Sequence, residues 1–360
     1  MAKASQPQLI VNARFLTQPL TGVQRFAIEL CLCLKKILPG MKFVAPRNIL
    51  HQKIAEELEV EPFGKFTSHL WEQIELPVFL KQQHSPLLLN LCNTAPLFYK
   101  RNIVCIHDIA FQVNPGWFSP TFVKLYKFLI PKIARRSLQV LTVSNFSKAE
   151  IISYTGIPEN KVKVIYNGIA DIFQQTVKME EPATSEDYIL SVSSIDPRKN
   201  LKLLIQAYKQ IQLPELKLVI VGSESKVFAD TQLKEEIKDC PGIKFTGYLP
   251  DDELARLYQM AGMFVYPSLY EGFGIPPLEA MANGCPTIVS NAAALPEICG
   301  DASLYVNPLK VDDLAEKIKL LHADVALQQQ LREKGYKQIR QFSWEKSANE
   351  LAFLIKQYLK

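Results

Sequence analysis

The sequence predicts an α/β protein with two doubly wound domains, each built on a mostly parallel sheet with helices on both faces. Three observations lead to this fold class. The 360 residues exceed the length at which one hydrophobic core usually stops growing. Short apolar segments alternate with helical segments along the chain. A polar stretch at residues 174–187 interrupts the alternation near the middle and is typical of a linker.

Most of the expected strands are nearly continuous apolar runs, as strands of a parallel sheet covered on both faces usually are. In the first half of the chain they cover residues 8–15, 42–46, 86–92, 102–108, 139–144 and 161–167. In the second half they cover residues 188–194, 216–222, 243–249, 263–268, 286–291 and 303–308. Helices are expected at 22–38, 120–137, 199–211, 251–261, 277–284, and at about 311–321, 325–340 and 344–359. In this architecture ligands bind at the carboxyl ends of the strands, and a cleft between two such domains is a natural substrate site.

The composition, 48% hydrophobic and 21% charged, is ordinary for a globular protein. No apolar run approaches the ~18 residues of a membrane span, and the start shows no run of signal-peptide type. The seven cysteines form no CxxC pair, so we expect small buried thiols rather than zinc ligands or disulfides. The net charge of +5 divides into +8 for residues 1–182 and −3 for residues 183–360. A basic first half favours an anionic partner, namely a phospholipid, a lipid-linked phosphate or a nucleic acid, with a solvated surface as the alternative.

Polar residues follow several strands of the first half. Gly22 lies in a turn before a helix, whose exposed N–H groups suit an anionic or sugar ligand. His107 and Asp108 end an apolar strand, where the pair can position or polarise a substrate group. Ser144 precedes a helix that it can cap, or it can donate to an oxyanion. Each of them has an ordinary structural role as its alternative: a turn for Gly22, a core histidine with a capping aspartate for His107 and Asp108, and a helix cap for Ser144.

Two cations, Arg198 and Lys199, follow the first strand of the second half and are expected to open a helix. A helix start disfavours positive charge, so their placement indicates an anion at the same spot. A diphosphate suits both, because Arg gives bidentate hydrogen bonds and Lys a point charge.

The segment YEGFGIPPLEAMANG contains two carboxylates, Glu271 and Glu279, with no other charge between them. Gly274 lets the backbone approach a ligand closely, and Pro276 and Pro277 suit a helix start. Glu279 is therefore expected on the first helical turn and Glu271 on the preceding loop. Backbone N–H groups at this helix start favour phosphate, and carboxylates favour sugar hydroxyls, so the segment predicts a sugar-nucleotide site.

These motifs resemble the retaining glycosyltransferases of family 4, also called group 1 glycosyl transferases, which have the GT-B fold. The resemblance covers nearly the whole chain, and its most specific element is the E-x7-E pair Glu271 and Glu279. The motifs at 21–26, 143–148, 197–200 and 342–348 agree with it. TGVQR together with DPRKN resembles bacterial mannosyltransferases of polysaccharide assembly.

The resemblance implies a role for each residue of the pair. Glu271 would contact hydroxyls of the donor sugar, and Glu279 would contact the nucleotide ribose. The backbone of the same segment would line the donor sugar and the distal phosphate at Phe273, Gly274, Ile275 and Leu278.

The resemblance also implies that Lys199 binds the diphosphate. Many members carry a Gly-Arg pair where this sequence has Ser193–Ser194, so Arg198 is expected to supply the missing charge. His107 would lie near the sugar and the acceptor, and Gly22 in a loop that closes over the phosphates and the acceptor. The expected catalytic set is His107, Arg198, Lys199 and Glu271, and the expected binding set in the first domain is Gly22, Asp108 and Ser144.

In GT-B enzymes the chain crosses back at its end. The resemblance therefore implies an acceptor-binding domain of residues 1–178 plus about 345–360, and a nucleotide-sugar-binding domain of residues 183–344. The expected reaction is retaining transfer of a hexose, first of all mannose from GDP-mannose, to a glycan or lipid-linked acceptor. No metal or cofactor is expected, because no DxD sequence lies in a suitable loop. A cytoplasmic location would follow, with peripheral contact at the inner face of the membrane as a further option.

Other functions stay open at this point. They are transfer from a UDP-sugar, and an inactive protein that only binds sugar nucleotides. A glycoside hydrolase pair of carboxylates is disfavoured by the adjacent cations, a dehydrogenase by the missing GxGxxG, and nucleic-acid binding by the scattered basic charge. Residues 117–136 mix aromatic residues with five cations, which suits either a membrane surface or a buried helix with solvated lysines.

Overall fold

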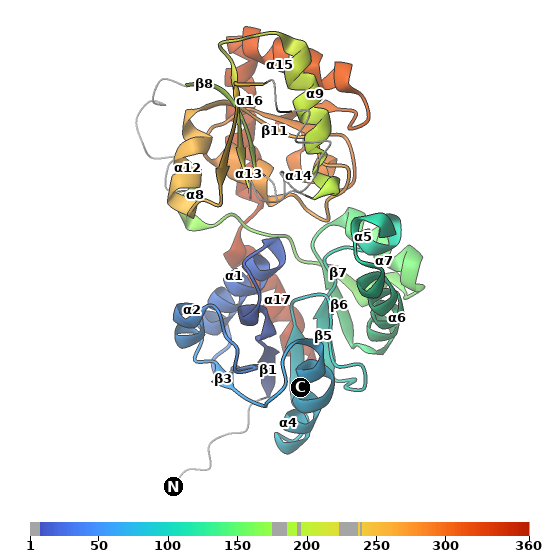
Figure 1. Cartoon of the computed structure of the whole chain (residues 1–360). Helices are drawn as coiled ribbons and strands as arrows, with labels where there is room; N and C mark the ends of the chain where they lie inside the picture. Colours follow the sequence, from blue (N-terminus) through green and yellow to red (C-terminus); the bar gives the residue numbers. More distant parts are fainter. Residues whose placement is uncertain (1–7, 175–185, 193–195, 223–236, 238–239, 360) are drawn as a thin grey trace. The chain divides into compact units, whose positions relative to one another are not determined.

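In the computed structural model the chain divides into two compact units (Figure 1). The first unit comprises residues 1–168 and 343–360, and the second comprises residues 169–342. The structure describes residues 8–174, 186–192, 196–222, 237 and 240–359. Most of the expected linker at 174–187, and the Ser193–Ser194 pair, lie outside the described residues.

The described part of the first unit contains a seven-stranded parallel sheet in the order β3-β2-β1-β4-β5-β6-β7. Its strands are β1 (Leu9–Asn12), β2 (Lys42–Ala45), β3 (Glu61–Pro62), β4 (Leu87–Asn90), β5 (Asn102–Cys105), β6 (Gln139–Thr142) and β7 (Val162–Val164). The order along the sheet reverses between β1 and β4, which is the topological switch point where α/β sheets bind ligands.

Most helices of the first unit contribute buried apolar side chains to its core. They are α1 (Gly22–Ile37), α2 (Gln52–Glu57), α3 (Ser68–Leu70), α4 (Leu76–Gln82), α5 (Ala110–Val113), α6 (Pro120–Arg136), α7 (Asn145–Thr155) and α17 (Trp344–Tyr358). A π-helical turn, Trp71–Glu75, joins α3 to α4.

The described part of the second unit contains a six-stranded parallel sheet in the order β10-β9-β8-β11-β12-β13. Its strands are β8 (Glu186–Val192), β9 (Lys217–Val221), β10 (Ile243–Gly247), β11 (Ala261–Tyr266), β12 (Thr287–Ser290) and β13 (Ser303–Val306). The switch point lies between β8 and β11. The helices are α8 (Asp171–Gln174), α9 (Leu201–Ile211), α12 (Asp251–Met260), α13 (Ile275–Ala282), α14 (Leu295–Cys299), α15 (Val311–Ala323) and α16 (Val325–Gln338).

The two parallel sheets confirm the predicted fold class, and each of the twelve expected strands is present. The strand β3 was not predicted, because two exposed residues leave no apolar pattern. All seven cysteines are free thiols, and four of them are buried. Within the described residues, no helix combines the length and the apolar character that crossing a bilayer requires.

The final helix, α17, returns to the first unit, where it packs against α1. The indole of Trp344 lies edge-on to Phe26, with ring centroids 6.1 Å apart. Ser347 Oγ donates a hydrogen bond to the Tyr166 carbonyl oxygen at 2.7 Å. Gly168 leaves room for Trp344, since a Cβ atom at Gly168 would lie 2.6 Å from the indole Cγ and closer still to the Trp344 backbone nitrogen.

We expect Gly168→Ala to destabilise the first unit by about 1–3 kcal/mol, because the added methyl group overpacks a backbone contact that cannot move easily. Chemical denaturation, followed through the transition of the first unit, measures this change. Gly116→Ala is the matched control, because its Cβ atom would meet only the Asn114 side-chain oxygen, at 3.2 Å. Equal stability of the two variants would contradict the packing role of Gly168.

Candidate functional site

The polar residues of the second unit gather at the carboxyl ends of β8 and β11. Lys199 lies in a 3₁₀ turn, Pro197–Lys199, that follows β8. Tyr266 is the last residue of β11, and Glu271 lies in the loop between β11 and α13. Because β8 and β11 are neighbours at the switch point, residues far apart in the sequence meet at one edge of the sheet.

Lys199, Tyr266 and Glu271 form a closed triangle of hydrogen bonds. Lys199 Nζ lies 2.5 Å from Glu271 Oε1 and 2.6 Å from the Tyr266 hydroxyl oxygen. The Tyr266 hydroxyl donates to the same Glu271 oxygen at 3.0 Å. The Lys199 and Glu271 side chains are 14% and 12% exposed, whereas Tyr266 is fully buried behind them. The triangle therefore presents a fixed cation and a fixed carboxylate at the surface of the unit.

The triangle keeps Lys199 charged. Burial by itself disfavours the ammonium ion, but the Glu271 carboxylate and the Tyr266 hydroxyl outweigh this effect and raise the pKa of Lys199. The pKa of Tyr266 is also raised, by burial first and by the nearby Glu271 second, so its hydroxyl stays protonated. A neutral hydroxyl can accept from Lys199 and donate to Glu271 at the same time.

Arg198 is oriented by its own turn rather than by the triangle. Its Nε and Nη2 atoms donate to Asp196 Oδ2 at 3.0 and 2.8 Å, and its backbone N–H donates to Asp196 Oδ1 at 2.9 Å. Burial opposes ionisation of Asp196, yet Arg198 lowers the pKa of that carboxyl group overall. The expectation that both cations open a helix was wrong, because Asn200, at φ 56°, separates their 3₁₀ turn from α9.

Helix α13 begins at Ile275 and not at Pro277, because Gly274 adopts a left-handed conformation (φ 101°) and caps it. Glu279 is therefore the fifth residue of the helix, beyond the first turn where we had expected it. Its carboxylate is buried and accepts a hydrogen bond from the Tyr258 hydroxyl at 3.2 Å. This buried bond fixes the direction of the Glu279 side chain.

In the segment before and inside α13, the backbone is more available to a ligand than the side chains are. Phe273 is buried, with its ring 5.6 Å from that of Phe342, and the Leu278 side chain is fully buried. Gly274 has φ 101°, a conformation that other residues rarely adopt, and a Cβ atom there would also lie 2.6 Å from Leu295 Cδ2, so the position favours glycine. Prolines at positions 276 and 277 carry no N–H, which leaves Gly274 and Ile275 as the backbone donors at the helix start.

The other expected site residues lie in the first unit. His107 is buried, and its Nε2 atom lies 2.9 Å from the Leu91 carbonyl oxygen, as in a satisfied core histidine. Burial lowers the pKa of His107, so the imidazole is neutral at pH 7. Asp108 Oδ1 accepts from the Ala110 N–H at 3.0 Å, and Ser144 Oγ accepts from the Ser147 N–H at 3.0 Å, which are capping contacts. Gly22 is the exposed first residue of α1.

The structure therefore brings together Lys199 and Glu271 in one cluster, with Arg198 in the same turn and Glu279 on the adjoining helix. The sequence analysis missed Tyr266 and Tyr258, which orient these carboxylates. A tyrosine that ends an apolar strand next to a charged loop is a weak signal, because aromatic residues are common in strands of any kind. Chemically, the cluster combines a cation, oriented carboxylates and backbone N–H groups, a set that binds a ligand with both anionic and hydroxyl groups.

Comparisons with known proteins identify the family and the fold of this chain. The family model "Glycosyl transferases group 1" matches residues 172–338, and the model "Glycosyltransferase Family 4" matches residues 82–171. O-antigen chain mannosyltransferase B of Escherichia coli is 28% identical over 91% of this chain and 93% of its own length. O-antigen chain mannosyltransferase RfbU of Salmonella typhimurium is 28% identical over 83% of this chain and 87% of its own.

Solved structures give the same fold. HepE of Anabaena, in complex with UDP and glucose, superposes with a TM-score of 0.73 over 97% of this chain and 99% of its own, at 18% identity. This likeness supports a GT-B fold with two Rossmann-like domains. The family models, the mannosyltransferase relatives and the glycosyltransferase fold together confirm the resemblance seen in the sequence. The chain belongs to the group 1, or family 4, glycosyltransferases, and it is a glycosyltransferase.

Proposed function

We propose that this enzyme transfers mannose from GDP-mannose, with retention of the anomeric configuration, to a hydroxyl group of a glycan or lipid-linked acceptor. The observation that carries the proposal is the Lys199–Tyr266–Glu271 triangle at the carboxyl edge of the second sheet. In this proposal Lys199 binds the diphosphate, and Glu271 binds the hydroxyls of the donor sugar. No metal or cofactor takes part in this proposal, since Lys199 and Arg198 supply the positive charge.

The hydrogen-bond capacity of the triangle fits a sugar diphosphate. An ammonium group has three N–H donors, and Tyr266 and Glu271 use two of them, which leaves one for a phosphate oxygen. Glu271 receives both of its bonds at Oε1, so among the described residues its Oε2 atom has no partner and suits a sugar hydroxyl. On α13, Glu279 binds the nucleotide ribose. The sugar and the distal phosphate are lined by the backbone at Phe273, Gly274, Ile275 and Leu278.

The proposed reaction breaks the bond between C1 of the sugar and the diphosphate oxygen, through an oxocarbenium-like transition state. Negative charge develops on the leaving diphosphate, where a preorganised cation gives the largest stabilisation. The acceptor oxygen bonds to C1 on the same face, and its proton passes to the leaving phosphate oxygen. His107 is neutral, and in this proposal it orients a substrate group rather than acting as an obligate base.

Mannose as the transferred sugar is supported by the relatives named above, two mannosyltransferases of O-antigen chains. Both relatives are 28% identical to this chain, and their similarity favours mannose as the hexose. GDP-mannose is accordingly the first donor to test, and a UDP-sugar is the second.

A thermal-shift screen of GDP-mannose, UDP-glucose, GDP and UDP tests the donor, because a ligand that binds only the folded state raises its apparent stability. We expect the guanine compounds to raise the melting temperature most. Lys199→Ala should then reduce kcat/KM for GDP-mannose on the order of tens-fold to thousands-fold, because the diphosphate loses its cation.

Lys217→Ala removes an exposed lysine of the same unit and should leave kcat/KM unchanged. A Lys199→Ala enzyme with wild-type kcat/KM would rule out the diphosphate role. A larger shift with UDP compounds would replace GDP-mannose by a UDP-sugar donor.

Tyr266→Phe should lower kcat roughly 10- to 100-fold, which corresponds to the ~1.5–3 kcal/mol of a hydrogen bond to a charged group. Without the hydroxyl, Lys199 and Glu271 keep their ion pair but lose the anchor that fixes its direction. Steady-state kinetics with varied donor measures the change, with Tyr248→Phe at an exposed position as the control. An unchanged kcat would show that the Lys199–Glu271 ion pair does not need the Tyr266 hydroxyl to keep its direction.

We further propose that helix α6 of the first unit contacts an anionic membrane surface, as a lipid-linked acceptor would require. Phe128 is 53% exposed and Leu125 is also exposed, among the exposed cations Lys124, Lys127 and Lys132. Lys132 Nζ lies 3.3 Å from the centre of the Phe128 ring. Exposed apolar side chains among cations are typical of helices that lie at a membrane surface.

Flotation with vesicles of phosphatidylglycerol and phosphatidylethanolamine tests this contact. We expect the wild-type protein to float and Phe128→Ser together with Lys127→Glu to lower the floating fraction several-fold, because apolar and electrostatic attraction are both reduced. Leu320→Ser, an exposed position on α15, is the control. Wild-type protein that stays at the bottom of the gradient would refute the contact.

A further inference from the structure

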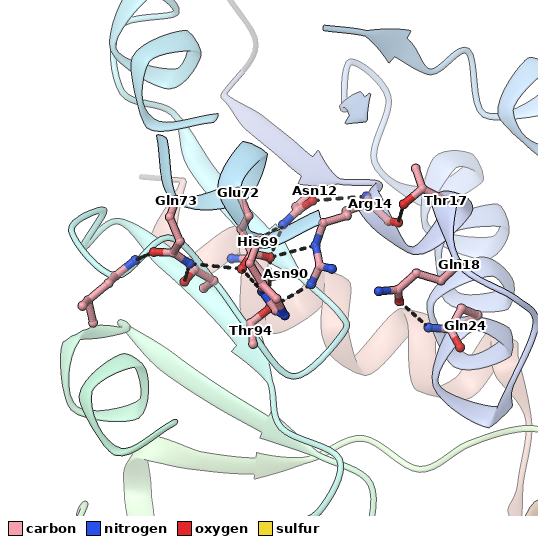
Figure 2. A network of polar contacts seen from close by, with 12 residues as sticks. Asn12, Arg14, Thr17, Gln18, Gln24, His69, Glu72, Gln73, Asn90 and Thr94 are labelled. Atoms are coloured by element: carbon pink, nitrogen blue, oxygen red, sulfur yellow. Dashed lines mark hydrogen bonds and ion pairs between the residues drawn. The ribbon is translucent and has the colours of Figure 1, made fainter. Parts of the chain in front are cut away.

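The first unit contains a cluster of buried polar side chains that none of the expected motifs accounts for (Figure 2). Arg14 donates from Nε to Glu72 Oε2 at 3.2 Å and from Nη2 to Thr94 Oγ1 at 2.9 Å. Asn12 Nδ2 donates to the same Glu72 oxygen at 3.2 Å and to Asn90 Oδ1 at 3.0 Å. Thr94 Oγ1 donates to Glu72 Oε2 at 3.0 Å. Glu72 is thus the centre of the cluster.

The cluster lies where an α/β sheet binds its ligand. Asn12 ends β1 and Asn90 ends β4, and Arg14 begins the short 3₁₀ helix that follows β1. The strands β1 and β4 are neighbours at the switch point of the first sheet. Ligands of such sheets bind outside the carboxyl ends of the strands at this point.

The stability of the fold does not explain the cluster. Arg14 and Glu72 are both buried, and removing two charges from water costs several kcal/mol per ion before their attraction offsets it. Apolar residues of the same volume often stabilise a core as well or better. A buried ion pair at the ligand edge of a sheet therefore indicates a function other than stability.

Two nitrogen atoms of the cluster are buried and have no hydrogen-bond partner among the described residues. They are Arg14 Nη1 and His69 Nδ1, and the latter lies 3.6 Å from Glu72 Oε1. Buried polar atoms nearly always have a partner, so an oxygen atom from a ligand or a water is expected at Arg14 Nη1. The His69 side chain is 30% exposed and connects the cluster to solvent.

The charges of the cluster indicate the chemistry of that ligand. Burial opposes both charges, yet the ion pair raises the pKa of Arg14 and holds the pKa of Glu72 at about 2. Both groups are therefore charged at pH 7, and their charges cancel. A phosphate group would add a charge without a partner, whereas a neutral hydroxyl group would accept from Arg14 Nη1 at little electrostatic cost.

A row of aromatic rings leads to the cluster. Phe118 stacks on Phe122 with centroids 5.2 Å apart, and Phe122 stacks on Tyr126 at 3.9 Å. Tyr126 lies edge-on to His69 at 6.2 Å. These rings on or beside α6 are partly exposed. Because the rings stack on one another, the row presents its partly exposed side rather than its ring faces. A rigid apolar side next to a hydroxyl-binding donor suits a sugar, which has an apolar ring face and polar edges.

We propose that Arg14, with the Glu72 cluster and the aromatic row Phe118–Phe122–Tyr126, binds a neutral sugar ring of the acceptor. A hydroxyl of that sugar accepts a hydrogen bond from Arg14 Nη1, and its ring lies along the aromatic row on the side of His69. The inference deepens the proposed function, since it names a neutral glycan rather than a phosphate as the group that the first unit recognises.

Saturation-transfer NMR with methyl α-mannoside, methyl α-glucoside and methyl α-galactoside tests the subsite without any donor. We expect at least one of these probes to bind the wild-type protein, and sodium phosphate not to displace it. Arg14→Lys keeps the charge but removes Nη1, so it should weaken binding about tenfold or more. Phe122→Ala removes the middle ring of the aromatic row and does not change the residues of the buried ion pair. This variant therefore tests the subsite by itself if circular dichroism shows that Arg14→Lys does not fold.

Phe353→Ala removes an exposed ring of α17 and should leave probe binding unchanged. No binding of any hexoside, equal binding by wild type and both site variants, or displacement by phosphate would each overturn the subsite. The NMR experiment uses no nucleotide sugar. A negative result there is therefore distinct from a negative result in the donor screen with GDP-mannose.

Discussion

The constraint on which both sites depend is the geometry of a parallel sheet, because all strands of such a sheet end at the same edge. Each loop that leaves this edge starts from a buried, rigid strand, so residues distant in the sequence meet within hydrogen-bonding distance. In the second unit this brings Lys199 to Glu271. In the first unit it brings Arg14 to Thr94 and Asn12 to Asn90. In both units the meeting point is the place where the strand order reverses.

The two clusters use charge in the same way. Each holds a cation against a carboxylate, and neutral hydroxyl groups, of Tyr266 in one and Thr94 in the other, fix the geometry of the pair. Paired in this way, the charges tolerate burial, and the ligand meets donors and acceptors whose directions are already set. The cation in the second unit stays partly exposed and suits an anion, whereas the cation in the first unit is buried and compensated.

The sequence predicted the fold class, the strands and the family, because buried parallel strands and the E-x7-E motif leave strong local patterns. It also predicted that Lys199, Glu271 and Glu279 belong to one region. It placed the start of α13 two residues late, since the left-handed Gly274 and not the prolines sets that start. It missed Tyr266, Tyr258 and the Arg14–Glu72 pair, whose partners lie between 5 and 58 positions apart along the chain. The Tyr258–Glu279 and Arg14–Glu72 pairs depend on how separate elements pack, which no local pattern encodes, and the Tyr266–Glu271 bond depends on the conformation of one loop.

The return of α17 to the first unit fixes an order of events during synthesis. The second unit is continuous, so its core is complete once residue 342 has left the ribosome. The first unit, although its strands are made earlier, lacks Trp344 and the contacts of α17 until residues 344–358 have been translated. The apolar side of α1, with Phe26, therefore stays uncovered while the whole second unit is synthesised. Of the two units, the one whose strands are made first is therefore the last to be completed.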